Sequence, residues 1–273
     1  GIPLGIVDTR CRAPDPEAEK TTPKTPIEEK KTFDWVAGLR ACVDLAEQMP
    51  QTRITSVMDR EADFFELFDE QRNHPCVDVL MRAKHNRRLD KETRLFDHLR
   101  TSEARGEVQL TVKRRSTRGK RSKQKAQAGR QQREATLTLH YEQVEFPPQQ
   151  YHTGKAPVTV SAVHAVEATP PEGVEPVEWF LLTSRGIDSV DDAQQCLQDY
   201  AWRWRIEDWH RVLKSGCRIE ELAHQSGDRL ERAIAINLVI AWHIMVMTLL
   251  GREVPELPTD VLFSDLEIEV LQA

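Results

Sequence analysis

The chain has 273 residues, of which 39% are hydrophobic and 30% are charged, and its formal net charge is -6. This is the composition of a soluble globular protein, long enough to bury a large core in one or two domains. Its 5 Cys residues are scattered and form no Cys-x-x-Cys pair, so the sequence indicates neither a disulfide framework nor a zinc knuckle. A reducing cytoplasm is the expected compartment. The sequence shows no positively charged start followed by an apolar run, so it predicts no signal peptide.

The net charge conceals one strongly basic stretch. Between Lys113 and Arg133 the sequence holds ten Lys or Arg residues and no acid, with Lys120 and Arg121 near its middle. Such a stretch can neutralise the backbone phosphates of DNA, with an affinity that falls steeply with salt. The alternative is a solvated loop that is basic by composition only. The acidity of the rest of the chain favours DNA, because the rest gains nothing evident from a local basic run.

In chain order, the first elements predict alternating strands and helices. The apolar run Leu4–Val7 predicts a first strand, and the β-branched run Arg53–Met58 predicts a short buried strand. The other elements expected here are a helix over Phe33–Gln48 with Thr32 as its cap, a helix over Ala62–Gln71 and a strand over Cys76–Arg82. This β-α-β order implies an α/β core. It places Asp59 at the carboxyl end of a strand, where open sheets commonly hold their chemistry.

From about Glu107 the pattern changes to strands separated by Gly, Pro and polar turns. The expected strands of this β-rich insertion are Val108–Val112, Ala135–Tyr141, Val158–Val163 and Trp179–Leu182. Ser189 is expected to cap the next helix, and a long apolar helix follows over Asp228–Leu250. Asn237, Trp242 and His243 interrupt that helix, which favours a buried or partner-packing helix over a membrane span. The expected segments are 1–105 and 187–227 for two parts of a core, 106–186 for the insertion with its basic loop, and 228–273 for a C-terminal helical segment.

The stretch Tyr200–Lys214 carries the most distinctive charge pattern of the chain. Tyr200, Arg203, Glu207 and Lys214 stand at offsets 0, 3, 7 and 14, which places them within a stripe of about 60° on a helix. The opposite side is apolar and consists of Trp202, Ile206, Trp209, Val212 and Leu213. One interpretation is an ordinary amphipathic helix with surface charges, and the other is a functional carboxylate ringed by cations and a phenol. A bend near Tyr200 would restrict the shared face to Arg203, Glu207 and Lys214.

Asp59 and Glu207 are candidates for a shared metal site. Two carboxylates brought together repel each other unless a cation lies between them. Mg²⁺ takes oxygen ligands, and a two-metal site can activate the attacking oxygen and stabilise the leaving oxygen in phosphodiester chemistry. The cations around Glu207 would then contact phosphates. The basic run that follows the strand over Cys76–Arg82 is expected to bind DNA in the same way, through Arg82, Lys84, Arg87 and Arg88.

Two motifs of this sequence resemble those of a known family. DREAD at Asp59–Asp63 and the spacing Y-x2-R-x3-E-x6-K over Tyr200–Lys214 resemble the signature of bacterial cut-and-paste transposases of the insertion-sequence-four family, whose best-known relative is the transposon-five enzyme. RAKHNRR, EWFLLTS and RWRIEDWH are similar to family segments as well, so the resemblance runs from about Gly5 to about Ala235. Each motif alone is a weak signal. Both together, far apart in the chain with a β-rich insertion between them, are a strong one.

The resemblance implies an α/β fold with an RNase H-like (retroviral-integrase-like) core. In such a core three acids, the DDE triad, hold two divalent metal ions, Mg²⁺ or Mn²⁺. Asp59 matches the second acid, and Glu207 matches the third. The implied partner is double-stranded DNA, both as transposon ends and as target, in the bacterial cytoplasm at the nucleoid. A homodimer is left open, and no membrane is involved.

The resemblance also assigns DNA contacts to single residues. Tyr200, Arg203 and Lys214 match residues that would hold the transposon-end phosphates near the cut. Trp179 matches a position that stacks on a base flipped out of the DNA, and an aromatic platform can offset the few kcal/mol that unstacking a base costs. Without the resemblance, Trp179 is more simply read as a core residue of its strand.

The sequence departs from the family pattern in one respect. The first acid of the triad is expected on a core strand that precedes a β-turn-β whose end resembles GIPLGIVD. Asp8 lies in the later strand and is not assigned. The expectation is therefore an N-terminally truncated transposase that lacks its first strands and first triad acid and is inactive alone. Two rivals stay open: a non-catalytic DNA-binding regulator of transposition, and a host nuclease of RNase H type, which would not need the basic insertion.

Overall fold

The computed structural model describes residues 2–12, 21–22, 24–112, 131–148, 152 and 154–272. The chain forms two compact units. The sheet unit is Pro16–Ala201, and the helical unit combines Gly1–Asp15 with Trp202–Ala273. The core and the insertion that the sequence suggests as separate segments therefore share one unit, since residues 16–105 and 106–186 both lie within it.

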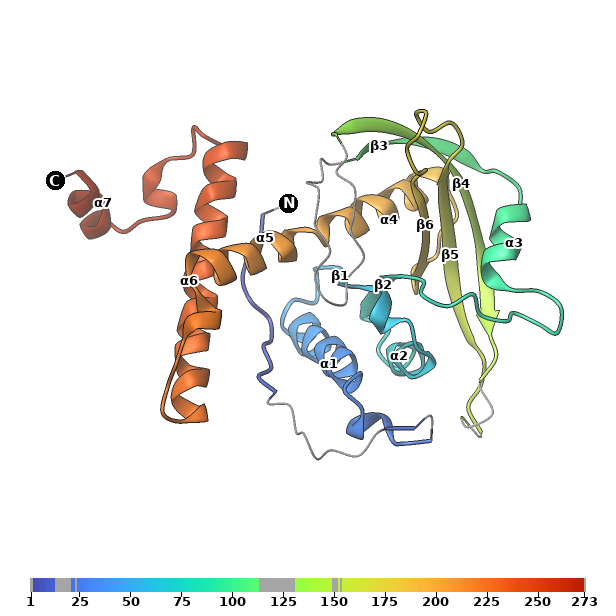
Figure 1. Ribbon diagram of the computed structural model, residues 1–273, viewed down its shortest axis with the longest axis horizontal. Coiled ribbons are helices and arrows are strands. Elements are labelled where there is room, and N and C mark those ends of the chain that lie inside the picture. The colour runs from blue at the N-terminus through green and yellow to red at the C-terminus, as the bar shows by residue number, and fades with distance from the viewer. Residues whose placement is uncertain are drawn as a thin grey trace. The chain divides into compact units, whose positions relative to one another are not determined.

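The sheet unit is built on a six-stranded sheet in the order β1-β2-β6-β5-β4-β3. Its strands are β1 (Ile54–Met58), β2 (Val77–Arg82), β3 (Gly106–Val112), β4 (Arg133–Phe146), β5 (Val158–Glu167) and β6 (Glu178–Thr183). β1 and β2 are parallel, and the other neighbouring strands are antiparallel. The two longest strands, β4 and β5, curl along the sheet (Figure 1). The prediction of a mixed α/β fold is confirmed.

Helices cover both faces of this sheet. α1 (Phe33–Gln48), α2 (Phe65–Gln71) and α3 (Leu95–Thr101) pack on one face, and α4 (Val190–Trp202) packs on the other. Side chains alternate between the faces along a strand. Val79 and Met81 of β2 therefore enter the core under α1 and α2, whereas Leu80 enters the core under α4. Each fully buried side chain of this size contributes about 1.5–3 kcal/mol, so both faces of the sheet are firmly held.

Three expectations near the start of the chain are wrong. The run Leu4–Val7 forms no strand; its neighbour Pro3 instead accepts a hydrogen bond through its carbonyl from Trp242 Nε1 at 3.2 Å. Thr32 has helical backbone angles and makes no side-chain cap to α1. The helix expected from Ala62 begins only at Phe65, because Asp59 caps a separate 3-10 turn over Arg60–Ala62. The bounds predicted for α1 are confirmed.

The cap predicted at Ser189 is also confirmed. Ser189 Oγ accepts a hydrogen bond from Asp192 N at 3.1 Å, and Asp192 Oδ2 accepts one from Ser189 N at 3.0 Å. This reciprocal pair satisfies two backbone donors at the start of α4, as in a capping box. It fixes the point at which the chain leaves the sheet and turns back across it.

The single helix expected over Tyr200–Lys214 is wrong. α4 ends at Trp202, α5 covers Arg205–Arg211, and a π-helical turn follows over Val212–Gly216. The apolar residues of the stretch are buried in different cores, because Tyr200 packs in the sheet unit under α4 and Leu213 packs in the helical unit. The bend that the sequence left open is therefore present, two residues after Tyr200. The stripe of four side chains does not lie on one helix.

The longest element of the helical unit is α6 (Gly227–Glu253). Leu238 and Ala241 pack with Leu213 in a small core. A second face of α6 is exposed and apolar, and consists of Ile236, Val239, Ile240, Ile244 and Met247. By length and composition α6 is the one described helix that could cross a membrane, and 28% of its most apolar stretch is buried. The expectation of a buried or partner-packing helix stays a prediction for this face, which the described part of the chain leaves uncovered.

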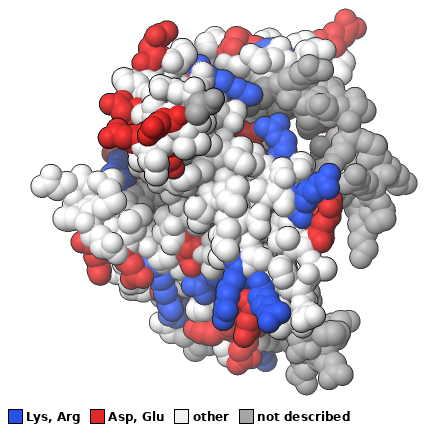
Figure 2. Space-filling model, turned by 90° about the vertical axis from the view of Figure 1, so that its left-hand side faces the viewer, with Lys and Arg blue, Asp and Glu red and all other residues white. Residues whose placement is uncertain are grey.

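The last helix of the unit, α7 (Asp265–Gln272), is amphipathic and exposed. Figure 2 views the side on which α6 and α7 lie and shows a broad uncharged area with acidic side chains gathered at its upper left. The acids of α7 are Asp265, Glu267 and Glu269, and its exposed apolar residues are Leu266, Val270 and Leu271.

Candidate functional site

Strand register gathers four of the predicted site residues at one end of the sheet. β1 and β2 pair Met58 with Met81, so Asp59 follows its strand at the level of Arg82. β6 runs antiparallel to β2, and Ala83 N donates to Phe180 O at 2.8 Å, which puts Trp179 opposite Lys84. Neighbouring strands lie about 4.8 Å apart. The carboxyl ends of β1 and β2 and the start of β6 therefore meet.

Asp59 provides a carboxylate without a cation at this end of the sheet. The side chain is partly buried, and its Oδ1 accepts a hydrogen bond from Glu61 N at 2.6 Å. Within the described ranges, no Lys, Arg or His forms an ion pair with it. One carboxylate oxygen is thus oriented by the backbone, and the negative charge is not compensated by a neighbouring side chain there. This is the state in which a carboxylate best serves as a metal ligand.

Asp63, the last residue of DREAD, has the opposite surroundings. Its side chain is 0% exposed and forms an ion pair with Arg87. Oδ2 accepts hydrogen bonds from Lys84 N at 2.7 Å and His85 N at 3.0 Å, and Oδ1 accepts from Arg87 Nε at 3.1 Å and from Arg87 Nη2. A carboxylate has about four lone-pair sites, so those of Asp63 are fully used. The two ends of the same motif therefore differ: one acid is available for a ligand, and the other is not.

The basic run after β2 divides into an inward and an outward set. Arg87 points inward, with its side chain 11% exposed and its guanidinium 5.1 Å from the centre of the Phe146 ring. Direct phosphate contact was expected of Arg87, but its donors are turned toward Asp63. Lys84 and Arg88 are exposed, and Arg82 is exposed while donating to Glu178 O at 3.1 Å. Only these three can present charge to a DNA strand without rearrangement.

Trp179 and Tyr200 contact each other inside the sheet unit. Their ring centres are 5.6 Å apart at an angle of 74°, which is an edge-to-face pair. Tyr200 is 6% exposed and belongs to the core under α4, and Trp179 is partly buried against the same core. The structure thus places Trp179 as a core-facing strand residue, as the simpler reading of the sequence has it. Tyr200, expected on an exposed face, is an internal residue.

A polar cluster fastens α4 beside this aromatic pair. Arg185, which follows β6, pairs with Asp199 Oδ2 at 2.5 Å and also donates to the Thr55 hydroxyl of β1. The side chains of Arg185 and Asp199 are only 10% and 14% exposed. Asp199 directly precedes Tyr200, so this ion pair fixes the rotation of α4 that buries the Tyr200 ring. Sequence reasoning missed Arg185, because a single Arg after a strand has no distinguishing pattern.

Glu207 lies on α5 in the helical unit. It is half exposed, and its Oε1 is 3.8 Å from Arg203 Nη1, a distance that gives a weak surface pair. The Arg203 guanidinium also lies 5.7 Å from the centre of the Trp204 ring. Lys214, in the π-helical turn, pairs with Glu220 at 3.3 Å and is exposed. Arg203 and Glu207 therefore stay neighbours as the sequence predicts, whereas Lys214 has a different partner.

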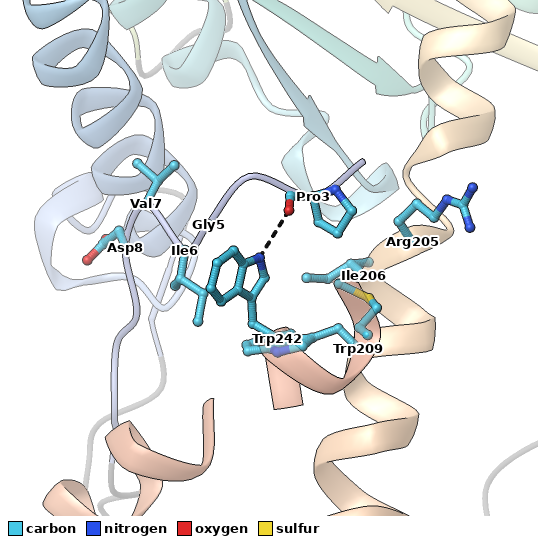
Figure 3. Close-up of a pocket in the computed structure, with 10 residues that line it drawn as sticks. Pro3, Gly5, Ile6, Val7, Asp8, Arg205, Ile206, Trp209 and Trp242 are labelled. Atoms are coloured by element: carbon cyan, nitrogen blue, oxygen red, sulfur yellow. Dashed lines mark hydrogen bonds between the residues drawn. The ribbon is translucent and has the colours of Figure 1, made fainter. Parts of the chain in front are cut away.

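Next to Glu207, α5 forms one wall of an apolar pocket of about 290 Å³ (Figure 3). Ile206 and Trp209 of α5 and Trp242 of α6 line it together with the N-terminal segment from Pro3 to Asp8. Both indole N–H groups are satisfied, since Trp209 donates to Leu238 O at 3.3 Å and Trp242 donates to Pro3 O. Asp8 and Arg205 are the charged residues of its described lining, and neither is a predicted site residue. Arg205, at its rim, pairs with Glu253 at 2.6 Å.

Metal binding by the candidate acids is supported by donor type alone. Among the described residues, no group of three or more His, Cys, Asp or Glu side chains could hold a metal ion. Asp59 belongs to the sheet unit and Glu207 to the helical unit. Their carboxylate oxygens are the donors that Mg²⁺ and Mn²⁺ prefer. The predicted DNA contacts Lys120 and Arg121, and most of the basic stretch around them, lie outside the described residues.

Comparison with protein families gives a match over most of the chain. Residues 36–242 match the family described as the transposase DDE domain. The match begins in α1 and ends in α6, and so includes Asp59, Trp179 and Glu207.

Proposed function

Because this chain belongs to the family of transposase DDE domains, we propose that it acts in cut-and-paste transposition, by metal-dependent cleavage and transfer of DNA strands at transposon ends. The observation that carries the proposal is the contrast within DREAD. Asp59 has no described cation partner, although Arg60, Arg82 and Lys84 lie close to it in the chain or in register. A carboxylate kept apart from neighbouring cations suits a metal ligand better than a structural ion pair.

The proposed divalent site involves Asp59 and Glu207, in an RNase H-like arrangement of the insertion-sequence-four type. A bound Mg²⁺ or Mn²⁺ would supply Lewis-acid activation of a phosphodiester. Asp59 enters such a site with Oδ1 already oriented by Glu61 N, which limits the carboxylate to one presentation. Lys214, which is exposed, and Arg203, whose side chain is 19% exposed, are proposed to bind backbone phosphates, where cations add affinity but no sequence preference.

The exposed cations after β2 extend this DNA surface in the sheet unit. Arg82 is level with Asp59 on the neighbouring strand, and Lys84 and Arg88 follow in the loop after β2; all three are exposed. Trp179, opposite Lys84, is proposed to stack on an unpaired base. It would have to exchange part of its contact with Tyr200 for the base, which is an exchange of one aromatic contact for another. The DNA would be double-stranded transposon ends and target in the bacterial cytoplasm, bound by one copy of the chain or by a homodimer.

We further propose that this chain alone has little cleavage activity. The family pattern places three acids around its two metal ions, and the sequence matches only the second and the third, Asp59 and Glu207. Among the described residues, no third acid joins either of them in a group that could hold a metal ion. Activity would then require another carboxylate supplied by additional polypeptide.

The experiment combines metal titration and DNA nicking. Calorimetric titration of Mn²⁺ into the chain bound to a DNA duplex is expected to show heat that Asp59→Asn and Glu207→Gln each reduce at least several-fold. Glu61→Gln and Asp208→Asn are matched controls, because these acids neighbour the two candidates in sequence and are not proposed ligands. Equal loss in candidates and controls would refute the metal site. Efficient nicking of supercoiled plasmid that Glu207→Gln abolishes would refute the low activity and support the transposase chemistry.

A further inference from the structure

The buried ion pair of Asp63 and Arg87 also holds the backbone of the loop that follows β2. A buried pair is seldom the most stable choice, since apolar residues of similar volume often serve stability as well or better. Here the carboxylate is saturated by two side-chain and two backbone donors. The backbone donors are Lys84 N and His85 N, which are the first residues of the basic loop. A hydrophobic pair could not hold those amides.

The loop that Asp63 holds is also tied at its other side. Asn86 Oδ1 accepts from Phe96 N at 2.8 Å, and Arg94 Nη1 donates to Asn86 O at 3.1 Å. Leu95 N donates to Arg87 O at 2.8 Å. The loop is therefore clamped between Asp63 and the start of α3. Lys84 and Arg88 are left pointing outward on a rigid support.

Asp63 and Asp59 are the two ends of a single 3-10 turn. Asp59 is its N-cap, Asp63 is its C-cap, and Asp63 N donates to Arg60 O. A movement of Asp63 would thus move the turn that begins at Asp59 and the loop that carries Lys84. The turn, Asp63 and the loop that carries Lys84 are therefore expected to move together.

We propose that Asp63 is a positioning residue: it holds the loop that carries Lys84 and Arg88 at a fixed place relative to the turn that begins at Asp59, so that both cations meet phosphates of the DNA strand that Asp59 serves. Arg87 holds the Asp63 carboxylate in place through their ion pair and does not contact DNA. The inference rests on the proposed function for the identity of the ligand, a DNA phosphodiester. Its structural part, the clamping of the loop, stands on the geometry alone.

The structural part is tested by hydrogen exchange. In Asp63→Asn the amide group turns one donor toward the donors of Lys84, His85 or Arg87, so at least one hydrogen bond is broken. Amide exchange in the peptide covering 83–89 is expected to rise by tenfold or more, with unchanged exchange in β4 and β5. Glu167→Gln is the matched control, because Glu167 is an equally buried partner of Arg133 on the far strands. Unchanged exchange of the 83–89 peptide in Asp63→Asn would overturn the proposal.

Asp63→Leu/Arg87→Met keeps the test decisive if the single variant unfolds. This double variant removes both charges, so no buried charge is left without a partner. The loop amides still lose their acceptors, and the same rise in exchange is expected. A folded double variant with the exchange of the native loop would equally overturn the proposal.

The DNA part is tested by salt-dependent binding of a random-sequence duplex. The slope of log affinity against log salt is expected to fall by about 0.9 for each phosphate that the chain no longer neutralises. The slope should fall by the same amount in the double variant Lys84→Ala/Arg88→Ala and in Asp63→Asn. Combining all three substitutions should lower the slope no further, and the control Glu167→Gln should leave it unchanged. Additive reductions would mean a merely structural Asp63 and overturn the positioning role. If the native chain binds no DNA, the proposed function and the identification of DNA as the ligand are both refuted. The hydrogen-exchange result still tests whether Asp63 holds the loop in place.

Discussion

Replacing Tyr200 separates packing from DNA contact at the residue that the structure moved from the surface to the interior. Tyr200 is 6% exposed and meets Trp179 edge to face. Truncating a buried aromatic side chain costs about 3–5 kcal/mol, of which about 0.5–1.5 kcal/mol belongs to such an aromatic pair. We therefore expect Tyr200→Ala to destabilise the sheet unit by about 3–5 kcal/mol. Tyr200→Phe retains the ring and should cost about 0.5–1.5 kcal/mol through its hydroxyl.

Urea unfolding followed by tryptophan fluorescence and circular dichroism measures these changes in stability. With a slope of about 2 kcal/mol/M, the Tyr200→Ala midpoint should fall by about 1.5–2.5 M. Trp202→Ala is the control, because Trp202 is in the same helix and 52% exposed, and its truncation should change stability by about 0.5 kcal/mol or less. A cost below about 1 kcal/mol for Tyr200→Ala would refute the internal position of the ring. DNA affinity lowered by Tyr200→Phe at unchanged stability would instead show that the hydroxyl reaches a phosphate.

Three further outcomes follow from buried groups of the sheet unit. Burial lowers the pKa of His164, against the opposing effect of its hydrogen bond to the Glu178 carboxylate, so the native state holds this ring neutral. Stability should therefore fall as pH drops below the ordinary His value of about 6.5, and urea midpoints across that range should be flatter in His164→Asn than in the native chain. Burial raises the pKa of Cys196 to about 12, which makes its thiol unreactive. A disulfide reagent should therefore label the exposed Cys11 and Cys76 in the native chain, and Cys196 only after unfolding. Rapid labelling of Cys196 in a native Cys11→Ser/Cys76→Ser variant would contradict this. A Cβ at Gly106 would lie 2.7 Å from Val190 Cγ2, so Gly106→Ala should cost about 1–3 kcal/mol in thermal or urea unfolding, and adding Val190→Ala should recover part of it.

Local signals located most of the elements. The 3.6-residue apolar period of α1 and the β-branched run of β1 are encoded in neighbouring residues, and their positions agree with the structure. The reciprocal cap of Ser189 with Asp192 is equally local. The strand expected at Leu4–Val7 failed because a strand exists only with a hydrogen-bonding neighbour, which a local pattern cannot supply.

The candidate site shows the same division. DREAD and the strand before it identify Asp59 as a residue of interest, but they do not predict the buried ion pair of Asp63. The difference lies in Arg87 and in the amides of Lys84 and His85, which approach Asp63 only after β2 has paired with β1. An Arg that contacts DNA and an Arg that anchors a loop look alike in a sequence.

The sequence by itself determined the family, the α/β class and the two acids at the centre of the proposed chemistry, because motif spacing and periodicity are properties of the chain. The tertiary structure alone decided how the stretch Tyr200–Lys214 divides. Its aromatic end is buried under the sheet, and its carboxylate stands on a separate helix of another compact unit. The physical reason is that burial and charge pairing depend on partners brought from elsewhere in the chain. A helical period predicts which residues share a face, but not whether the helix continues long enough to present it.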